Sequence, residues 1–468
     1  MKHLPLRVDV NLNPDEIVQA MKAKQEGKPS REPRGVALDT RAVQEGDLFF
    51  ALQATRDGHD FTAEAFARGA CAAVIHHDVD ATGPFLRVRD TLEALGAVAN
   101  LARRKWGKPV VAISGSNGKT TTKEMAAAVI GAHRNTLKTP GTWNNYLGVP
   151  LTLLLLRPEH ALAVLELGVN NFGEMGTLCR LAEPTVGVLT NIGPVHLEKL
   201  GSLDGVAKAK GELYEHLPEN GVAVINIDDP RLKSFEGSTR ARKITISLRG
   251  TADVSAKVVR DLGSDGLVLS VRYGAEEAEI RTPFVGIHNV YNLMCAFGAA
   301  LAMEVPVLKL QTGVQAVERP EMRLQMIPCP KGIRIVNDCY NANPGSMTVA
   351  LEVVRDFAQG RYLAALGDML ELGDFSPRAH RDIGIKVAGF KYSRLFVMGR
   401  YAGDVVQGAV QGGMKHERIK TFKTHAEMAQ AILEQLEPND TLLVKGSRGM
   451  KMELLTEELQ KGLAERGA

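Results

Sequence analysis

The chain has 468 residues, with 57 Lys and Arg against 54 Asp and Glu and a formal net charge of +3. At about 100–200 residues per domain, this length predicts two to four domains, each large enough to bury a core. Hydrophobic residues make up 44% and charged residues 24%, a composition that excludes a disordered chain. The near-balanced charge, with no long basic block, argues against nucleic acid as a partner.

The sequence also argues against a membrane protein and against a disulfide-stabilised one. The longest apolar run, Val149 to Leu156, is broken by Pro150 and is far shorter than the roughly 18 residues that a membrane span needs. The N-terminal residues lack the apolar core of a signal peptide. The five cysteines are scattered and form no CxxC pair, which argues against a disulfide framework and a structural zinc site. We therefore expect a cytoplasmic enzyme with reduced thiols.

Short apolar runs alternate with amphipathic helical patterns, which predicts an α/β architecture with largely parallel sheets. In the first segment the predicted strands are Val36–Leu38, Asp47–Leu52, Ala73–His76 and Phe85–Val88. A helical pattern covers Leu92–Trp106, and Gly107 and Pro109 come directly after it. Because these two residue types stop helices, we place a domain boundary near residue 107.

The second segment opens with Val110–Ser114, a continuous apolar run of the kind that forms buried parallel strands. Further predicted strands are Ala161–Leu167, Val186–Asn191 and Ala223–Asp228. Alternating residues over Val254–Arg281 predict antiparallel strands, and a helical pattern follows over Asn289–Met303. We place the second boundary at Glu318–Pro320, where this pattern breaks.

The third segment repeats the alternation of strands and helices. Its predicted strands are Ile333–Asn337, Tyr362–Leu366, Leu395–Met398 and Thr441–Val444. The sequence therefore predicts three α/β domains, over residues 1–107, 108–318 and 319–468.

A glycine-rich turn follows the strand Val110–Ser114 and leads into a helical pattern over Lys123–Gly131. Strand, turn and helix in this order are typical of a phosphate-binding loop, because glycines let backbone N–H groups approach phosphate oxygens at a helix N-terminus. Lys119 is expected to contact the β- and γ-phosphates, and Thr120 to offer its hydroxyl to Mg²⁺. Ile113 stands where the strict Walker pattern has glycine, but the context favours nucleotide binding over a chance turn.

An acidic residue and a histidine follow other strands of the second segment. Glu166 ends an apolar strand, where a carboxylate can bind Mg²⁺ beside a phosphate loop; the alternative is a solvated loop carboxylate. His196 lies just beyond the strand Val186–Asn191 and, taken alone, is more often a structural histidine than a ligand.

Lys210 lies on the apolar stripe of a helical pattern over Leu203–Leu217, whereas Lys208 points elsewhere. A lysine that faces inward is costly unless it is paired or chemically altered. It could extend to solvent, pair with a carboxylate, contact phosphate, or be carbamylated into an anionic metal ligand. The spacing alone does not choose among these.

Several motifs resemble, in order and spacing, those of the Mur ligases: GSNGKTTTKEM, ELG at Glu166–Gly168, NIGPVHLEKLGS, AKAKGEL and GIHNVYN. That family makes amide bonds on peptidoglycan precursors at the expense of ATP. The resemblance extends from Asp39 to Glu453. It implies a central P-loop mononucleotide-binding domain with a mostly parallel sheet, a C-terminal Rossmann-like ligase domain, and a smaller N-terminal α/β domain that binds a UDP-sugar.

Within this family, Asn337–Met347, Gly367–Gly373 and Lys445–Glu453 resemble the branch that adds D-alanyl-D-alanine to UDP-N-acetylmuramoyl-tripeptide through an acyl phosphate. The alternatives are the ligase that adds the third peptide residue, folylpolyglutamate synthase, and a non-catalytic P-loop nucleotide switch. The resemblance also implies ATP and Mg²⁺ as cofactors. We expect a monomer whose domains close, because the acyl phosphate must be kept from water.

The resemblance assigns roles to individual residues. The implied nucleotide contacts are Gly115, Ser116, Asn117, Gly118, Lys119, Thr120, Thr121, Asn289, Asn292, Arg323 and Asp338. The implied Mg²⁺ ligands are Thr120, Glu166, His196 and Lys210 as a carbamate, and the catalytic set is Lys119, Glu166, His196 and Lys210. The implied substrate contacts are Thr40 and Arg41 near the uridine diphosphate, Asn144 and Asn145, and Asn341, Asn343 and Ser346 on the acceptor-peptide side.

Overall fold

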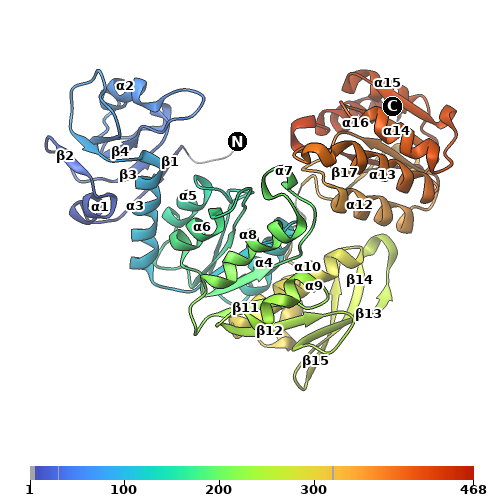
Figure 1. Cartoon of the computed structure of the whole chain (residues 1–468), viewed down its shortest axis with the longest axis horizontal. Helices are drawn as coiled ribbons and strands as arrows, with labels where there is room; N and C mark the ends of the chain where they lie inside the picture. Colours follow the sequence, from blue (N-terminus) through green and yellow to red (C-terminus); the bar gives the residue numbers. More distant parts are fainter. Residues whose placement is uncertain (1–5, 30, 319–320, 468) are drawn as a thin grey trace.

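The computed structural model describes residues 6–29, 31–318 and 321–467, which form three α/β units with one sheet each (Figure 1). Most strand pairs in the three sheets are parallel, so the predicted fold class is confirmed. The predicted boundary at Glu318–Pro320 includes residues 319 and 320, which lie outside the described part. Among the described helices, none is long and apolar enough to cross a membrane.

The first unit has a six-stranded sheet whose two edge strands are antiparallel to their neighbours. In sheet order, its strands are β1 (Arg7–Asp9), β3 (Gly35–Ala37), β4 (Asp47–Phe50), β5 (Ala72–Ile75), β6 (Phe85–Arg87) and β2 (Lys24–Glu26). Its helices are α1 (Pro14–Met21), α2 (Thr62–Ala67) and α3 (Thr91–Trp106). The sequence did not predict β1, β2, α1 or α2; the two strands have three residues each, too few for a detectable pattern.

The central unit has a nine-stranded sheet that is parallel from β8 to β13 and antiparallel at its far edge, as predicted. In sheet order, its strands are β15 (Glu276–Thr282), β14 (Leu267–Tyr273), β13 (Val254–Asp261), β12 (Arg242–Ser247), β11 (Val222–Asn226), β10 (Val186–Leu189), β7 (Val110–Ser114), β9 (Leu162–Glu166) and β8 (Thr136–Lys138). Its helices are α4 (Lys119–Gly131), α5 (Gly148–Leu154), α6 (Glu174–Ala182), α7 (Leu197–Leu200), α8 (Leu203–Glu215), α9 (Pro230–Lys233), α10 (Ile287–Ala302) and α11 (Leu310–Val314).

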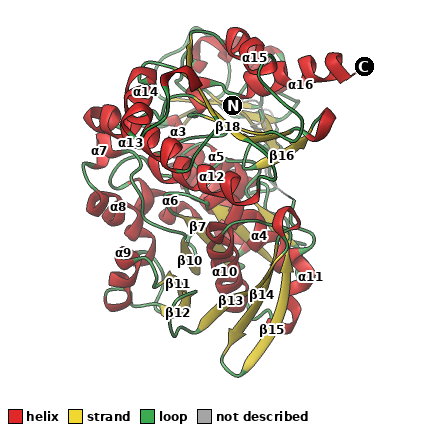
Figure 2. Cartoon of the chain, turned by 90° about the vertical axis from the view of Figure 1, so that its right-hand side faces the viewer, coloured by secondary structure: helices red, strands yellow, loops and turns green. Residues whose placement is uncertain are grey.

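The third unit has a six-stranded sheet with one antiparallel edge strand, β16. In sheet order, its strands are β16 (Gln325–Pro328), β17 (Arg334–Asp338), β21 (Thr441–Lys445), β18 (Tyr362–Leu366), β19 (Arg394–Met398) and β20 (Ile419–Phe422). Its helices are α12 (Pro344–Phe357), α13 (Ser376–Gly389), α14 (Ala402–Gln411), α15 (His425–Leu433) and α16 (Glu453–Gly467). Figure 2 shows α15 and α16 at the end of the molecule opposite to the strands β13–β15.

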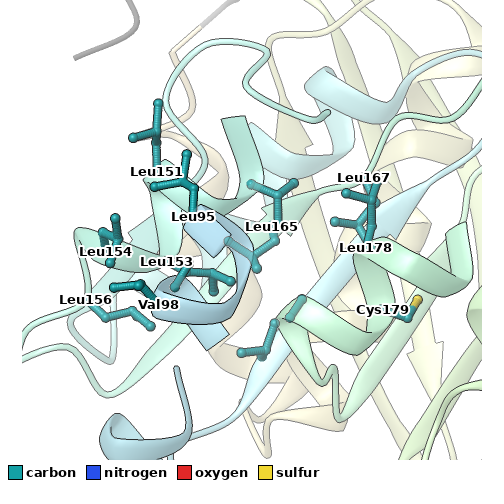
Figure 3. Close-up of a cluster of buried hydrophobic side chains, with 14 of the residues drawn as sticks. Leu95, Val98, Leu151, Leu153, Leu154, Leu156, Leu165, Leu167, Leu178 and Cys179 are labelled. Atoms are coloured by element: carbon teal, nitrogen blue, oxygen red, sulfur yellow. The ribbon is translucent and has the colours of Figure 1, made fainter. Parts of the chain in front are cut away.

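Helix α3 joins the first unit to the central one. It ends at Gly107, as the sequence predicted, and the φ of 69° at this residue gives a left-handed C-cap. Its residues Leu95 and Val98 belong to the same buried cluster as Leu151 of α5 and Leu178 of α6 (Figure 3). Since one continuous core spans both units, α3 fixes the position of the first sheet against the central one.

Candidate active site

The loop between β7 and α4 has the backbone shape of a phosphate cradle. Gly115 and Gly118 have φ values of 139° and 79°, a region that glycine adopts readily. A Cβ on Gly115 would lie 2.0 Å from Oγ1 of Thr190, and one on Gly118 would lie 2.2 Å from Oδ1 of Asn292. Helix α4 begins at Lys119, four residues before the predicted start at Lys123. The helix N-terminus therefore lies directly at the loop, where its dipole favours an anion.

Hydrogen bonds to the residues after β10 hold this loop open. The N–H of Ser116 donates to the carbonyl of Asn191 at 2.9 Å, and the N–H of Asn117 donates to the Asn191 side chain at 3.1 Å. The hydroxyl of Thr190 donates to the carbonyl of Asn117 at 2.5 Å. Lys119 folds back so that its Nζ donates to the carbonyl of Gly115 at 2.8 Å. The loop is thus pre-organised, and its lysine lies over it.

A cleft of about 800 Å³ lies at this loop, between the central and third units. It brings together most of the residues that the sequence singled out: Ser116, Asn117, Gly118, Lys119, Thr120, Thr121, Asn144, Asn145, Glu166, His196, Asn289, Asn292, Arg323, Asp338, Asn341, Asn343 and Ser346. Four others do not line it, namely Gly115, Lys210, Thr40 and Arg41. Thr40 is buried in the first unit, and Arg41 is exposed there and pairs with Asp39.

Glu166 has the features expected of a carboxylate that binds a cation. It is 1% exposed, and its Oε1 accepts a hydrogen bond of 2.7 Å from the Asn144 side chain. Its Oε2 is buried and has no partner among the described residues. Desolvation lowers the pKa of Lys119, and the charge of Glu166 opposes that shift. Because an unpartnered buried carboxylate oxygen is costly in the absence of a cation, this site fits a hard divalent ion such as Mg²⁺.

Lys210 faces inward from α8, as predicted, and is 1% exposed, while Lys208 is exposed. In the part of the chain that the structure describes, its ammonium makes no hydrogen bond or ion pair, and the side chain is almost completely buried. Burial, and then the charge of Lys119, lower the pKa of Lys210 well below its ordinary value. The structure thus favours neither an extended nor a carboxylate-paired lysine. A neutral amine is the form that can react with carbon dioxide to give a carbamate.

His196 connects the central and third units. It is the N-cap residue of α7, with a φ of 51°, and its Nδ1 lies 2.7 Å from Oε2 of Glu371, whose φ is 63°. Since a carboxylate accepts, the proton shared with Glu371 lies on Nδ1, and a neutral imidazole in this tautomer has its lone pair on Nε2. His196 lines the cleft, so this nitrogen is available as a ligand.

Two asparagines on the first turns of α10 form another wall of the cleft. The side chain of Asn292 donates to Oδ1 of Asn289 at 3.1 Å, and Asn289 donates to the carbonyl of Val285 at 2.9 Å. Both amides are therefore held in fixed orientations, and that of Asn292 lies beside Gly118. The implied contact of these asparagines with adenine remains a prediction.

The third unit reaches the phosphate loop through its own side chains. Arg323 donates to Oγ1 of Thr120 at 2.9 Å and stacks on the ring of Tyr340 at 4.2 Å. The Tyr340 hydroxyl donates to Oγ1 of Thr142 at 2.7 Å. Asn343 donates to Oδ1 of Asn117 at 2.6 Å. Tyr340 was missed by the sequence analysis, because a tyrosine in a loop carries no pattern that shows which unit it will contact.

Four of the third-unit residues are held by hydrogen bonds within that unit. Asp338 accepts from the buried Nζ of Lys445 at 2.5 Å, and the same Nζ donates to the carbonyl of Asn341 at 2.9 Å. Asn343 and Ser346 form a capping box at the start of α12, with Ser346 N donating to Asn343 Oδ1 at 2.9 Å. Lys445 therefore orders this wall of the cleft, a role that the sequence analysis did not assign.

A second group of metal-ligating side chains lies in the first unit. One nitrogen from each of His59, His76 and His77 lies within 4.8 Å of the others. However, Nδ1 of His59 bonds Asp57 at 2.6 Å, and its Nε2 accepts from the N–H of His76 at 3.1 Å. The rings of His59 and His77 are stacked at 3.8 Å, so their lone pairs do not converge. These contacts close a loop of the first unit rather than form a metal centre.

Comparison with protein families identifies all three units. Residues 32–105 match the model described as "Mur ligase family, catalytic domain", residues 113–300 match "Mur ligase middle domain", and residues 322–448 match "Mur ligase, glutamate ligase domain". The three matches follow the order of the three sheets along the chain.

Similar proteins agree with these matches. The chain is 34% identical over 430 residues to UDP-N-acetylmuramoyl-tripeptide–D-alanyl-D-alanine ligase of Bacillus subtilis (strain 168), covering 91% of this chain and 93% of that protein. A crystal structure of MurF from Acinetobacter baumannii superposes with a TM-score of 0.90 at 31% identity, over 97% of this chain and 100% of that one. MurF ligase from Thermotoga maritima, in complex with ADP, superposes with a TM-score of 0.83 at 26% identity, over 92% of this chain and 98% of that one.

Proposed function

The chain belongs to the Mur ligase family of ATP-dependent enzymes, and from this premise we propose that it joins D-alanyl-D-alanine to UDP-N-acetylmuramoyl-tripeptide. The product would be the UDP-linked pentapeptide precursor of peptidoglycan. One structural observation supports the proposal independently of sequence similarity. A single cleft contains the phosphate loop, the Glu166 carboxylate with its unpartnered oxygen, and residues of the Asn341–Ser346 stretch. A ligase needs these three parts within reach of one another, whereas a nucleotide switch needs only the first.

The reaction requires activation, because a carboxylate is a poor electrophile. Attack of a carboxylate oxygen of the tripeptide on the γ-phosphorus of ATP forms a C–O–P bond and releases ADP. The amine of the dipeptide then attacks the acyl carbon, which forms the amide, releases phosphate and gives up one proton. The first step brings two anions together, and Lys119 with the loop N–H groups would offset that repulsion.

The residues around Glu166 fit Mg²⁺, which when bound would neutralise phosphate charge and orient the γ-phosphoryl group. Thr120 and Glu166 would hold one ion, and His196 with the carbamate of Lys210 would hold a second. In the structure, the Thr120 hydroxyl accepts a hydrogen bond from Arg323, so this arginine lies beside the oxygen that would hold the ion. A carbamate would replace the disfavoured buried ammonium with a charge that a cation can pair.

We assign the remaining roles by unit. The first unit would bind the UDP-sugar through Thr40 and Arg41. The central unit would bind ATP, with Asn289 and Asn292 at the adenine. The third unit would contribute Arg323 and Asp338 to the binding of ATP. The domains would span residues 1–107, 108–318 and 319–468. The acceptor side would be lined by Asn144, Asn145, Asn341, Asn343 and Ser346. The contacts of Tyr340 and Asn343 with the central unit support closure over the cleft, which would exclude water from the acyl phosphate.

The substrate assignment predicts phosphate release that depends on two substrates. With Mg-ATP, we expect turnover only when both UDP-N-acetylmuramoyl-tripeptide and D-alanyl-D-alanine are present. Single amino acids, and a folate with glutamate, serve as the comparison acceptors and should give less than about one hundredth of that rate. Turnover with a single amino acid would assign the chain to another ligase of the family. Nucleotide binding without turnover for any pair would favour a switch.

A further inference from the structure

We propose that Lys123 is a positioning residue for Glu166, acting through the loop of residues 139–145; this inference rests on the proposed function. Lys123 lies one helical turn after Lys119 in α4, so both lysines face the same side of the helix. It is 0% exposed, yet it does not line the cleft and cannot itself touch nucleotide or substrate. A buried lysine that is kept away from the reacting groups needs a structural explanation.

All three protons of the Lys123 ammonium have acceptors. Nζ donates to the carbonyls of Thr139 at 2.8 Å and Gly141 at 2.9 Å, and to Oε1 of Glu124 at 2.5 Å. Glu124 also accepts from Nζ of Lys138 at 2.6 Å. Burial raises the pKa of Glu124, but the two lysines outweigh it and hold that pKa below its usual value. Lys123 is therefore a charged, fully satisfied anchor for two carbonyls of the loop.

The anchored loop holds Glu166 at two points. The backbone N–H of Glu166 donates to Oγ1 of Thr139 at 3.0 Å, and the side chain of Asn144 donates to Oε1 of Glu166 at 2.7 Å. The N–H of Gly168 donates to the carbonyl of Asn144 at 2.8 Å. Because Oε1 is held in this way, Oε2 is the oxygen left free toward the proposed cation. The orientation of the carboxylate is thus set by the loop, and the loop is set by Lys123.

The same loop receives the third unit, since Oγ1 of Thr142 accepts from the Tyr340 hydroxyl. Loss of the Lys123 anchor would therefore loosen both the carboxylate and the surface on which the third unit docks. Lys123→Met keeps an unbranched side chain, one atom shorter, but leaves the carbonyls of Thr139 and Gly141 without their charged donor. Lys138→Met is the matched control, because Lys138 bonds the same Glu124 but is 43% exposed and donates to no loop carbonyl.

The test is calorimetric binding of ADP across a Mg²⁺ titration, combined with hydrogen exchange of the metal-free protein. Mg²⁺ should increase the affinity for ADP, and Lys123→Met should raise the Mg²⁺ concentration that gives half of this increase about tenfold or more. This is the effect expected when a metal ligand loses its supporting contacts. Residues 139–145 should exchange faster in this variant without metal. Lys138→Met should change neither reading by more than about twofold.

Asn144→Ala removes the hydrogen bond from the loop to Oε1 of Glu166 and leaves the contacts of Lys123 in place. It should raise the Mg²⁺ concentration required for tight ADP binding as Lys123→Met does. In the double variant the two shifts should not add, because both act through the same carboxylate. A folded Lys123→Met protein with the wild-type Mg²⁺ dependence would overturn the inference. If Lys123→Met does not fold, a wild-type Mg²⁺ dependence in Asn144→Ala would overturn it instead. Failure of the wild-type protein to bind ADP more tightly with Mg²⁺ would contradict the proposed function, while the exchange measurement would still test the anchor.

Discussion

Replacing Lys210 with Met is expected to lower ligation by more than about 100-fold while leaving nucleotide affinity within a few fold of the wild type. Lys210 is buried in α8 and does not line the cleft, so its loss removes no direct contact with ATP. The carbamate that we propose would be lost with it. Phosphate release measured with both substrates, beside calorimetric binding of an ATP analogue, separates the two effects.

The thermal stability of Lys210→Met tests whether the buried ammonium is unfavourable in the metal-free protein. A buried ammonium without a partner is costly, so Met should leave the Tm of the metal-free protein unchanged or higher. Lys208→Met, on the exposed side of the same helix, is the matched control and should keep full activity. Retention of wild-type turnover in Lys210→Met would show that Lys210 is only a core residue, and would remove the second proposed cation site.

Gly118→Ala is expected to abolish measurable nucleotide binding. The new Cβ would lie 2.2 Å from Oδ1 of Asn292, so either the loop or the asparagine must move out of place. In addition, a non-glycine residue at a φ of 79° costs about 1–2 kcal/mol of folding free energy. Calorimetric titration with ADP measures the first effect, and denaturant unfolding measures the second.

Gly173→Ala distinguishes strain from the clash. Gly173 has a φ of 77°, nearly that of Gly118, but an added Cβ would meet no atom within 4 Å. This variant should lose a similar amount of stability and keep its affinity for ADP. Equal affinity for ADP in Gly118→Ala and Gly173→Ala would mean that the close approach of Asn292 to the loop has no part in nucleotide binding.

Features that depend on one segment of the chain could be predicted from the sequence. The strand, glycine turn and helix around Lys119 form a local unit, and their order was enough to identify the phosphate loop. The inward direction of Lys210 followed from helical spacing, because burial of an amphipathic helix repeats every three to four residues. The helix end at Gly107 followed from the residue types alone.

Features that depend on two distant segments could not be predicted in this way. The contact of Arg323 with Thr120 and that of His196 with Glu371 join residues from different units, and periodicity does not report how units dock. The anchoring of the 139–145 loop by Lys123 is hidden for another reason. A lysine in a TTTKEM stretch looks like a solvated helix residue until its carbonyl acceptors are known.

Transfer of oxygen-18 from the carboxylate to phosphate tests the central claim most directly. The peptide substrate would be UDP-N-acetylmuramoyl-tripeptide labelled with oxygen-18 in its reacting carboxylate, incubated with Mg-ATP and D-alanyl-D-alanine. An acyl phosphate retains a carboxylate oxygen in its C–O–P bridge, so mass spectrometry should find one labelled oxygen in each phosphate released, together with the pentapeptide product. Unlabelled phosphate, formed without an amide product, would show that the cleft only hydrolyses ATP and would contradict the ligase assignment.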